Sequence, residues 1–161
     1  MVYLRYISIF ALGLLLSSSC NDGTARRCGE DQGFQAHVIK IKYGTSFGYC
    51  VGYCWKQLVI DSDNIEFQKM SREENEPVNC ERDITCTEWV PLATNIDPND
   101  FFALAETIGC PDCADGGAEW LEIQTPTSKH KVTFEYMSPP TEISGYVTNL
   151  RELMKTFDNC N

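Results

Sequence analysis

The cysteine content limits the folds open to this 161-residue chain more than any other feature. Nine cysteines are spread along it: Cys20, Cys28, Cys50, Cys54, Cys80, Cys86, Cys110, Cys113 and Cys160. Disulfides persist outside the cytoplasm, where many small domains depend on them for stability. An odd number of cysteines in an exported protein leaves one sulfur without a partner. The chain therefore predicts a disulfide-stabilised domain in which one cysteine has a separate role.

The first twenty residues indicate export and set Cys20 apart from the other cysteines. Arg5 supplies a positive start, residues 7–16 are almost entirely apolar, and three serines precede Cys20. These are the charged region, the hydrophobic core and the cleavage zone of a signal peptide. A membrane-spanning helix needs about 20 apolar residues, roughly twice the length of this run. We therefore expect residues 1–19 to be a signal peptide that is removed.

The segment Leu16-Ser17-Ser18-Ser19-Cys20 resembles the lipobox of bacterial lipoproteins in a relaxed form. The usual leucine lies three positions before the cysteine, and Ser17 holds that position here. The resemblance implies a diacylated Cys20, a tether over residues 20–33, and anchoring to the outer membrane on its periplasmic or surface side. Cleavage near Ser19 without lipidation is the alternative, and it would give a secreted protein. Lipidation of Cys20 would leave eight cysteines, an even number.

The eight remaining cysteines allow on the order of 100 pairings. Their clustering along the chain favours three short bridges and one that ties the ends together: Cys50–Cys54, Cys80–Cys86, Cys110–Cys113 and Cys28–Cys160. The competing interpretation is a zinc site built from four thiolates, those of Cys50, Cys54, Cys110 and Cys113. Oxidation outside the cytoplasm favours the bridges over the metal site.

The charge balance disfavours nucleic acid as a partner. Without residues 1–19 the chain has 12 Lys and Arg against 23 Asp and Glu, so its net charge is −11. A phosphate backbone is bound by clusters of Lys and Arg, and Arg26-Arg27 is a lone basic pair. The remaining length of about 140 residues suits one domain with its own hydrophobic core.

The hydrophobic pattern predicts an α+β domain over residues 34–161, with an antiparallel sheet built from hairpins and two helices packed on it. The expected elements before the first helix are a strand at 34–43, a disulfide-held loop at 44–54, a hairpin at 57–61 and 65–70, an irregular acidic segment at 71–83 and a short edge strand at 84–93. A second hairpin is expected at 119–124 and 130–137, on either side of a Pro-Thr-Ser turn.

The two predicted helices have clear signals at their ends or along one face. Asp97 is a suitable cap, Pro98 suits the first helical position, and Gly109 is expected to end this helix. Its expected buried face is Phe101, Phe102, Leu104, Ala105 and Ile108. The final helix is predicted over residues 141–157 from an amphipathic stripe, which consists of Ile143, Val147, Leu150, Met154 and Phe157.

The loop Cys50-Val-Gly-Tyr-Cys54 and the order of elements around it resemble small bacterial lipoprotein domains of unknown function. In those domains a Cys-Gly-Cys loop precedes a strand hairpin. Trp55 stands where a proline often follows the second cysteine. The resemblance implies this kind of fold and a location in the cell envelope, and it implies no activity.

Four aromatic residues of the glycine-rich segment are candidates for a binding surface: Phe47, Tyr49, Tyr53 and Trp55. Aromatic side chains on a loop held by a disulfide suit a rigid interface. The alternative is that they cover the end of the sheet as part of the core. Both interpretations remain open at the level of the sequence.

Three features suggest chemistry but have simpler explanations. Cys110-Pro-Asp-Cys113 has the spacing of thiol redox enzymes, yet it follows the carboxyl end of a predicted helix, where the field disfavours a thiolate. Carboxylates surround Gly116-Gly117 and suit Ca²⁺, although their spacing matches no defined calcium loop; they are Asp112, Asp115 and Glu119. His37 and His130 have no nearby pattern of a catalytic triad.

These observations favour a lipid-anchored envelope protein that is a non-enzymatic binding or structural module. Its expected partners are the membrane, through the lipid on Cys20, and a protein or ligand that the sequence does not identify. No cofactor, metal or catalytic residue is assigned. The alternatives are a secreted thiol–disulfide or hydrolytic enzyme, and a secreted inhibitor that presents residues 44–54 to a protease.

Overall fold

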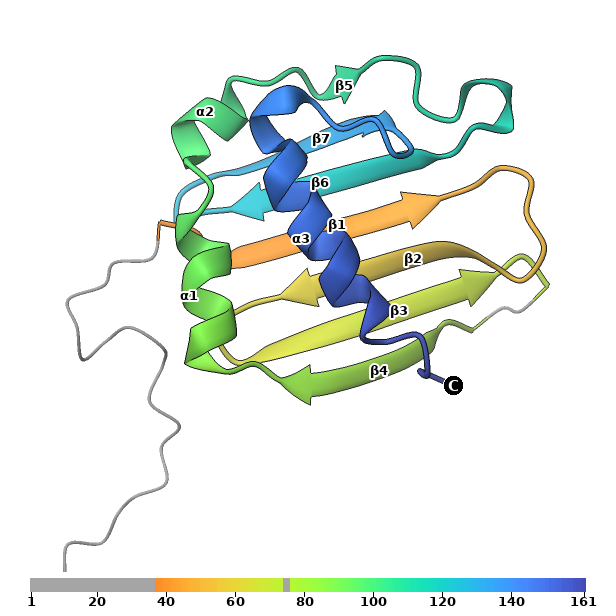
Figure 1. Ribbon diagram of the computed structural model, residues 1–161, viewed down its shortest axis with the longest axis horizontal. Helices are drawn as coiled ribbons and strands as arrows, with labels where there is room; N and C mark the ends of the chain where they lie inside the picture. The colour runs from red at the N-terminus through yellow and green to blue at the C-terminus, as the bar shows by residue number, and fades with distance from the viewer. Residues whose placement is uncertain (1–36, 74–75) are drawn as a thin grey trace, which may run out of the picture.

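The computed structural model describes residues 37–73 and 76–161, which form one seven-stranded sheet with the helices packed on one of its faces (Figure 1). The predicted signal peptide, the tether with Cys20 and Cys28, and the first residues of the strand expected at 34–43 lie outside the described residues. The α+β class is confirmed in its coarse form, a mostly antiparallel sheet with a few short helices.

The seven strands are arranged in the order β4-β3-β2-β1-β6-β7-β5. Neighbouring strands pair antiparallel, except that β5 pairs parallel with β7. Their bounds are β1 Lys40–Ser46, β2 Tyr53–Ile60, β3 Asn64–Ser71, β4 Val78–Asp83, β5 Thr107–Ile108, β6 Ala118–Gln124 and β7 Lys129–Glu135. Both predicted hairpins are therefore present, as β2–β3 and as β6–β7.

Three α-helices cover one face of the sheet (Figure 1). They are α1 Cys86–Thr94, α2 Pro98–Phe102 and α3 Ser144–Lys155, with short 3-10 turns at Cys113–Asp115 and Thr141–Ile143. The residues of the amphipathic stripe predicted for the final helix are all buried, which confirms that prediction. Strand residues of alternating position complete the core, because successive side chains of a strand point to opposite faces; they include Ile41, Leu58, Phe67, Leu121 and Val132.

The prediction of an edge strand at 84–93 is wrong, because most of this segment forms helix α1. Glu88 Oε2 accepts hydrogen bonds from the backbone N–H of Thr85 at 3.0 Å and from its hydroxyl at 2.8 Å. Arg82 holds the same carboxylate, and with the Thr85 backbone it lowers the pKa of Glu88 to about 2. Thr-x-x-Glu is the sequence signature of a capping box, and it outweighs Pro91, which lies inside the helix.

Other element boundaries also differ from those expected. The segment 71–83 is not wholly irregular, since Val78–Asp83 forms β4 and pairs with β3. The loop expected at 44–54 is shorter, because β1 continues to Ser46 and β2 begins at Tyr53. Asp97 caps α2 as predicted, by accepting from the backbone N–H of Asn99 at 2.8 Å. However, α2 ends at Phe102, and Thr107–Ile108 pairs with β7 as strand β5 in place of the last helical turn expected.

Of the four disulfide pairings predicted, two are present and the other two predictions are wrong. Cys50–Cys54 and Cys110–Cys113 are confirmed, so these four cysteines are not the thiolates of a zinc site. Cys80 bonds to Cys160, which excludes both Cys80–Cys86 and Cys28–Cys160. Strand β4 continues from Cys80 to Asp83, and α1 then starts at Cys86 beyond the end of that strand. Cys80 and Cys86 are therefore separated by the second half of β4. Cys86 is itself disulfide-bonded.

The bridge between Cys80 and Cys160 should stabilise the domain far more than the bridge between Cys110 and Cys113. It spans 80 residues of sequence against 3, and longer loops lose more denatured-state entropy on closure. The paired change Cys80→Ser with Cys160→Ser is expected to lower the free energy of unfolding by about 4.5 kcal/mol. The paired change Cys110→Ser with Cys113→Ser should lower it by about 2 kcal/mol. Urea unfolding would measure both, and equal losses would contradict this ranking.

Candidate functional site

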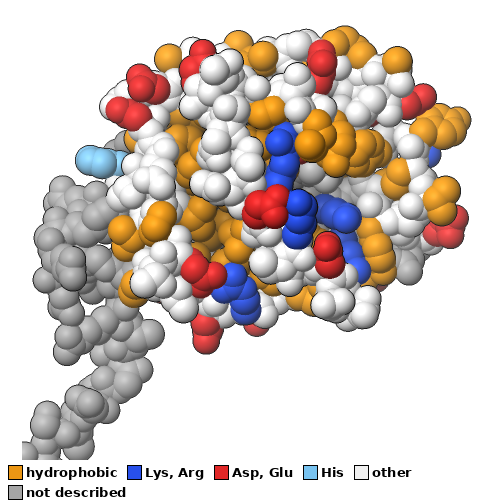
Figure 2. Space-filling view, viewed as in Figure 1, with side chains coloured by type: hydrophobic (Ala, Val, Ile, Leu, Met, Phe, Trp, Pro, Cys, Tyr) orange, Lys and Arg blue, Asp and Glu red, His pale blue; other side chains and the backbone are white. Residues whose placement is uncertain are grey.

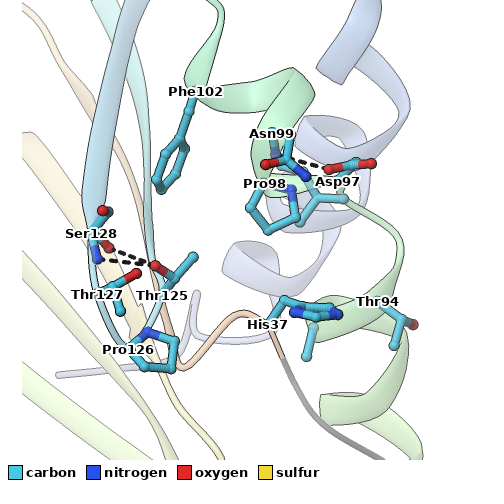
Figure 3. Close-up of a pocket in the computed structure, with 12 residues that line it drawn as sticks. His37, Thr94, Asp97, Pro98, Asn99, Phe102, Thr125, Pro126, Thr127 and Ser128 are labelled. Carbon is cyan, nitrogen blue, oxygen red and sulfur yellow. Dashed lines mark hydrogen bonds between the residues drawn. The ribbon is translucent and has the colours of Figure 1, made fainter.

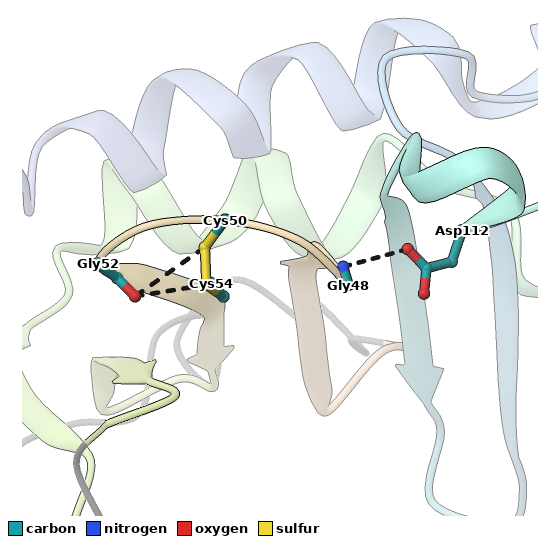
Figure 4. Close-up of a disulfide and its surroundings, with 5 residues drawn as sticks. All are labelled: Gly48, Cys50, Gly52, Cys54 and Asp112. Carbon is teal, nitrogen blue, oxygen red and sulfur yellow. Dashed lines mark hydrogen bonds between the residues drawn. A yellow bond between two sulfur atoms is a disulfide. The ribbon is translucent and has the colours of Figure 1, made fainter.

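Two disulfide-closed loops meet at one end of the sheet, which we call the stapled-loop end. Residues 47–52 connect β1 to β2 and are closed by Cys50–Cys54. Residues 109–117 lead into β6 and contain Cys110–Cys113. The backbone N–H of Gly48 donates to Asp112 Oδ1 at 3.3 Å and so connects the two loops (Figure 4).

Phe47 holds the base of this end together. Its ring meets the ring of Tyr136 edge to face, with 4.6 Å between centroids. It also lies over Gly117, where an added Cβ would be 2.5 Å from the ring, and Gly117 has a φ of +82°. Its backbone N–H donates to the carbonyl of Cys54 at 2.9 Å. Phe47 is therefore a packing residue of the stapled-loop end, consistent with the more conservative interpretation of this aromatic residue.

The stapled-loop end concentrates the exposed apolar side chains of the described residues. Six of the seven large hydrophobic residues classed as exposed lie there: Tyr49, Val51, Tyr53, Met70, Tyr136 and Met137. Tyr49 is 79 % exposed and Val51 is completely exposed. Hydrophobic side chains project at the right-hand end of the molecule in Figure 2. Gathered apolar side chains on a protein surface commonly mark an interaction site.

Two cations accompany the exposed tyrosines. The guanidinium of Arg72 lies 5.5 Å from the centre of the Tyr49 ring, and Nζ of Lys69 lies 4.1 Å from that of Tyr53. Aromatic residues and arginine are enriched in protein interfaces, so Tyr49 and Arg72 have the composition of a recognition surface, whereas Lys69 is buried. It involves Tyr49 and Tyr53, two of the four aromatic residues proposed from the sequence.

Trp55, the fourth proposed residue, lies elsewhere. It projects from the sheet face that carries no helix and stacks on Trp120 of β6, with 6.1 Å between ring centroids. Trp120 lies flat over Gly44 of β1, where an added Cβ would be 2.2 Å from the indole. Nζ of Lys131 lies 4.8 Å from the centre of the Trp120 ring. The sequence analysis did not single out Trp120, although a glycine inside a strand pattern often marks such a close approach.

The three carboxylates considered for calcium are not brought together. Asp112 and Asp115 lie near Gly48 in the stapled-loop end, whereas Glu119 is fully buried beneath α3. Within the described residues, no group of three or more His, Cys, Asp or Glu side chains has an arrangement that could hold a metal ion. The sequence placed these carboxylates close along the chain but did not show that they face different ways.

Glu119 belongs to a buried network that joins two strands to α3. Its Oε1 accepts from the Tyr43 hydroxyl and from Arg151 Nε, both at 2.9 Å, and its Oε2 accepts from Arg151 Nη2. Burial raises the pKa of Tyr43, and the negative charge of Glu119 raises it further. The hydrogen bond to Glu119 raises the pKa of Arg151. These shifts favour the neutral form of Tyr43 and the charged form of Arg151.

A groove of about 1050 Å³ lies at the opposite end of the sheet, between the start of α2 and the β6–β7 turn (Figure 3). His37 is at its edge. Asp97 is occupied in capping α2, and the Thr125 hydroxyl exchanges hydrogen bonds with the backbone of Ser128. The groove therefore has fewer free polar groups than its lining suggests. It also borders His37, the first of the described residues, and we assign it no ligand.

Two of the features considered for catalysis, His130 and the Cys110–Cys113 pair, have structural roles. His130 makes a 2.9 Å hydrogen bond with the carbonyl of Leu104 and packs its ring against Phe101 and Phe102. Cys113 begins a 3-10 turn of three residues, which is not the α-helical amino terminus that activates a thiol in redox enzymes. The disulfide of Cys110 and Cys113 closes a loop, as the sequence favoured.

Comparison with known proteins assigns no family, since neither a protein-family model nor a curated protein matches the sequence. Among the helices of residues 37–73 and 76–161, none is long and apolar enough to cross a membrane. The stapled-loop end is the candidate functional site because of its own geometry and composition.

Replacing Glu119 by Gln should destabilise the fold strongly. The change leaves the partly buried Arg151 without its counter-ion, and breaking a buried ion pair costs about 3 kcal/mol. Glu152→Gln is the matched control, because Glu152 pairs with Lys155 on the exposed side of α3, the helix that also carries Arg151. This exposed ion pair should contribute less than about 1 kcal/mol. Urea unfolding of both variants measures the difference. Similar small losses would show that Glu119 does not fix α3.

Proposed function

We propose that this protein is a non-enzymatic binding domain of the cell envelope, anchored by a lipid on Cys20, which contacts a protein partner through its stapled-loop end. The observation that carries the proposal is the exposure of Tyr49 and Val51 on a loop that is closed by a disulfide. A soluble domain gains nothing in stability from apolar side chains held in water. Their gathering at one end is the pattern expected of a contact surface.

The covalent and hydrogen-bonded framework of this end favours binding. Ordering a flexible loop costs affinity, whereas a loop held in one shape before contact avoids most of that cost. Here Cys50–Cys54 closes the first loop, and the bond from Gly48 to Asp112 connects it to the second. Tyrosine adds a large contact area with few rotatable bonds. The arrangement resembles a paratope in physical terms, with rigid aromatic anchors on a sheet scaffold.

The position of the stapled-loop end suits an anchored protein. The described chain begins at His37, beside the start of β1, and β1 then runs to the stapled-loop end (Figure 1). Seven residues of strand cover roughly 23 Å. A lipid attached ahead of β1 would therefore hold the domain by one end and leave the other end, with Tyr49 and Val51, directed away from the attachment.

The cysteine pairing supports the separate role proposed for Cys20. Six described cysteines pair among themselves, and Cys86 is oxidised as well. If Cys20 carries a lipid, Cys28 is the one cysteine left to pair with Cys86. The odd count of nine is then explained without a stray thiol.

Mass spectrometry of the mature protein from its native membrane tests the anchor. We expect a first residue of Cys20 that carries acyl chains, no free thiol, and a disulfide-linked peptide pair that contains Cys28 and Cys86. A Cys20→Ser variant is the control, and it should lose both the acyl mass and the membrane association. A disulfide between Cys20 and Cys86, or a protein that still begins at Met1, would contradict the lipid anchor.

Photo-crosslinking in living cells tests the binding surface. A photoreactive amino acid at Tyr49 should give a discrete covalent adduct with another protein, because this side chain is exposed on the proposed surface. The control position is Asn79, an exposed residue of edge strand β4, and it should give no such adduct. Val51→Ser should weaken the adduct formed from position 49. Adducts of equal yield from both positions, or none from Tyr49, would reject the stapled-loop end as the interface.

A further inference from the structure

A row of polar side chains crosses four strands on the helix-bearing face near the stapled-loop end. The strand register places Glu119 opposite Thr45, Thr45 opposite Lys56, and Lys56 opposite Lys69. Directly paired residues lie on the same face of a sheet. Leu58, two residues along from Lys56, is a core residue, so this row faces the side on which the helices pack.

The row carries positive charge that the described residues do not neutralise. Lys56 and Lys69 lie directly opposite each other, and like charges in that position destabilise a sheet. Glu119, the nearest carboxylate along the row, is already paired with Arg151. No carboxylate of residues 37–73 and 76–161 forms an ion pair with either lysine.

Lys69 has neutral partners in this arrangement. It is 6 % exposed, donates to the backbone carbonyl of Cys160 and lies against the Tyr53 ring. These contacts orient its ammonium group, but they contribute no negative charge. The Thr45 hydroxyl and the Lys56 ammonium make no hydrogen bond with the described residues. Two cations and one hydroxyl are thus collected in one row, on a chain whose formal net charge is −10.

A helix covers only one end of the row, since Glu119 lies beneath α3. Helix α3 crosses the middle of the sheet, and the ends of β1, β2 and β3 near the stapled-loop end extend beyond it (Figure 1). Lys and Arg side chains lie near the centre of this face together with Asp and Glu side chains in the space-filling view (Figure 2). Lys56 itself is only partly buried, so its ammonium group can reach a ligand from solvent.

We propose that this row is a binding site for a phosphate group, held by the ammonium groups of Lys56 and Lys69 and by the hydroxyl of Thr45. Lysine binds phosphate as a point charge, whereas a planar carboxylate is better matched by the fork of an arginine. Arg151, which reaches the row from α3, is occupied by Glu119. A bound phosphate would also offset the repulsion between the paired lysines. This site lies on the helix-bearing face and does not depend on the protein contact proposed for Tyr49.

The test compares thermal unfolding of the mature protein in sodium phosphate and in sodium chloride at equal ionic strength. Phosphate should raise the unfolding temperature of the parent protein, since a ligand that binds the folded state stabilises it. Lys56→Gln should remove this increase and weaken phosphate binding roughly tenfold, as loss of a charged hydrogen bond would. Without phosphate, the same variant should be at least as stable as the parent, because it removes a like-charge pair.

Lys129→Gln is the matched control, because it removes an exposed lysine of β7 outside the row and should leave the phosphate effect intact. Glycerol 3-phosphate in place of inorganic phosphate separates the two sources of this group. Tighter binding of the ester would indicate a phosphate carried by a lipid or polymer, and equal or weaker binding would indicate free phosphate. Either result supports the site if Lys56→Gln abolishes the binding. No difference between phosphate and chloride, or equal binding by Lys56→Gln and the parent, would overturn the proposal.

Discussion

The buried carboxylate of Glu119 determines how α3 lies on the sheet. Removing a charge from water is expensive, and Glu119 is tolerated in the core because Arg151 and Tyr43 satisfy both of its oxygens. These hydrogen bonds attach α3 to β1 and β6, and Cys80–Cys160 attaches the segment after α3 to β4. The helix therefore crosses the sheet at a defined place and leaves the strand ends at the stapled-loop end without a helical cover.

Both proposed surfaces depend on that placement. The loops with Tyr49 and Val51 extend beyond the part of the sheet that the helices cover. In the row, Lys56 remains partly exposed beside Lys69, which is buried and donates to the carbonyl of Cys160. The two differ in chemistry. The loops offer apolar and aromatic contacts held by disulfides, which suits a protein surface, whereas the row offers cations with a hydroxyl, which suits an oxyanion.

Sequence patterns predicted the elements whose burial is periodic. The stripe that includes Leu150 defined the last helix, and alternating residues defined both hairpins. Strand β4 was missed because its residues are half exposed and give no hydrophobic alternation. Helix α1 was missed because the segment was interpreted as an edge strand and the capping box of Thr85 and Glu88 was not considered. For the site, Tyr49 and Tyr53 were candidates with burial in the core as the alternative, and their exposure came only from the structure. The row of Lys56 and Lys69 arises from strand register, which neighbouring positions along the chain do not reveal.

The central claim is that the stapled-loop end is a rigid surface held by its disulfides, and backbone NMR order parameters test it most directly. For Tyr49 and Val51 in the oxidised protein, we predict values close to those of the strands, near the roughly 0.85 of rigid backbone. In the paired variant Cys50→Ser with Cys54→Ser, the same amides should become flexible, with values below about 0.6. Values this low in the oxidised parent protein would contradict the claim.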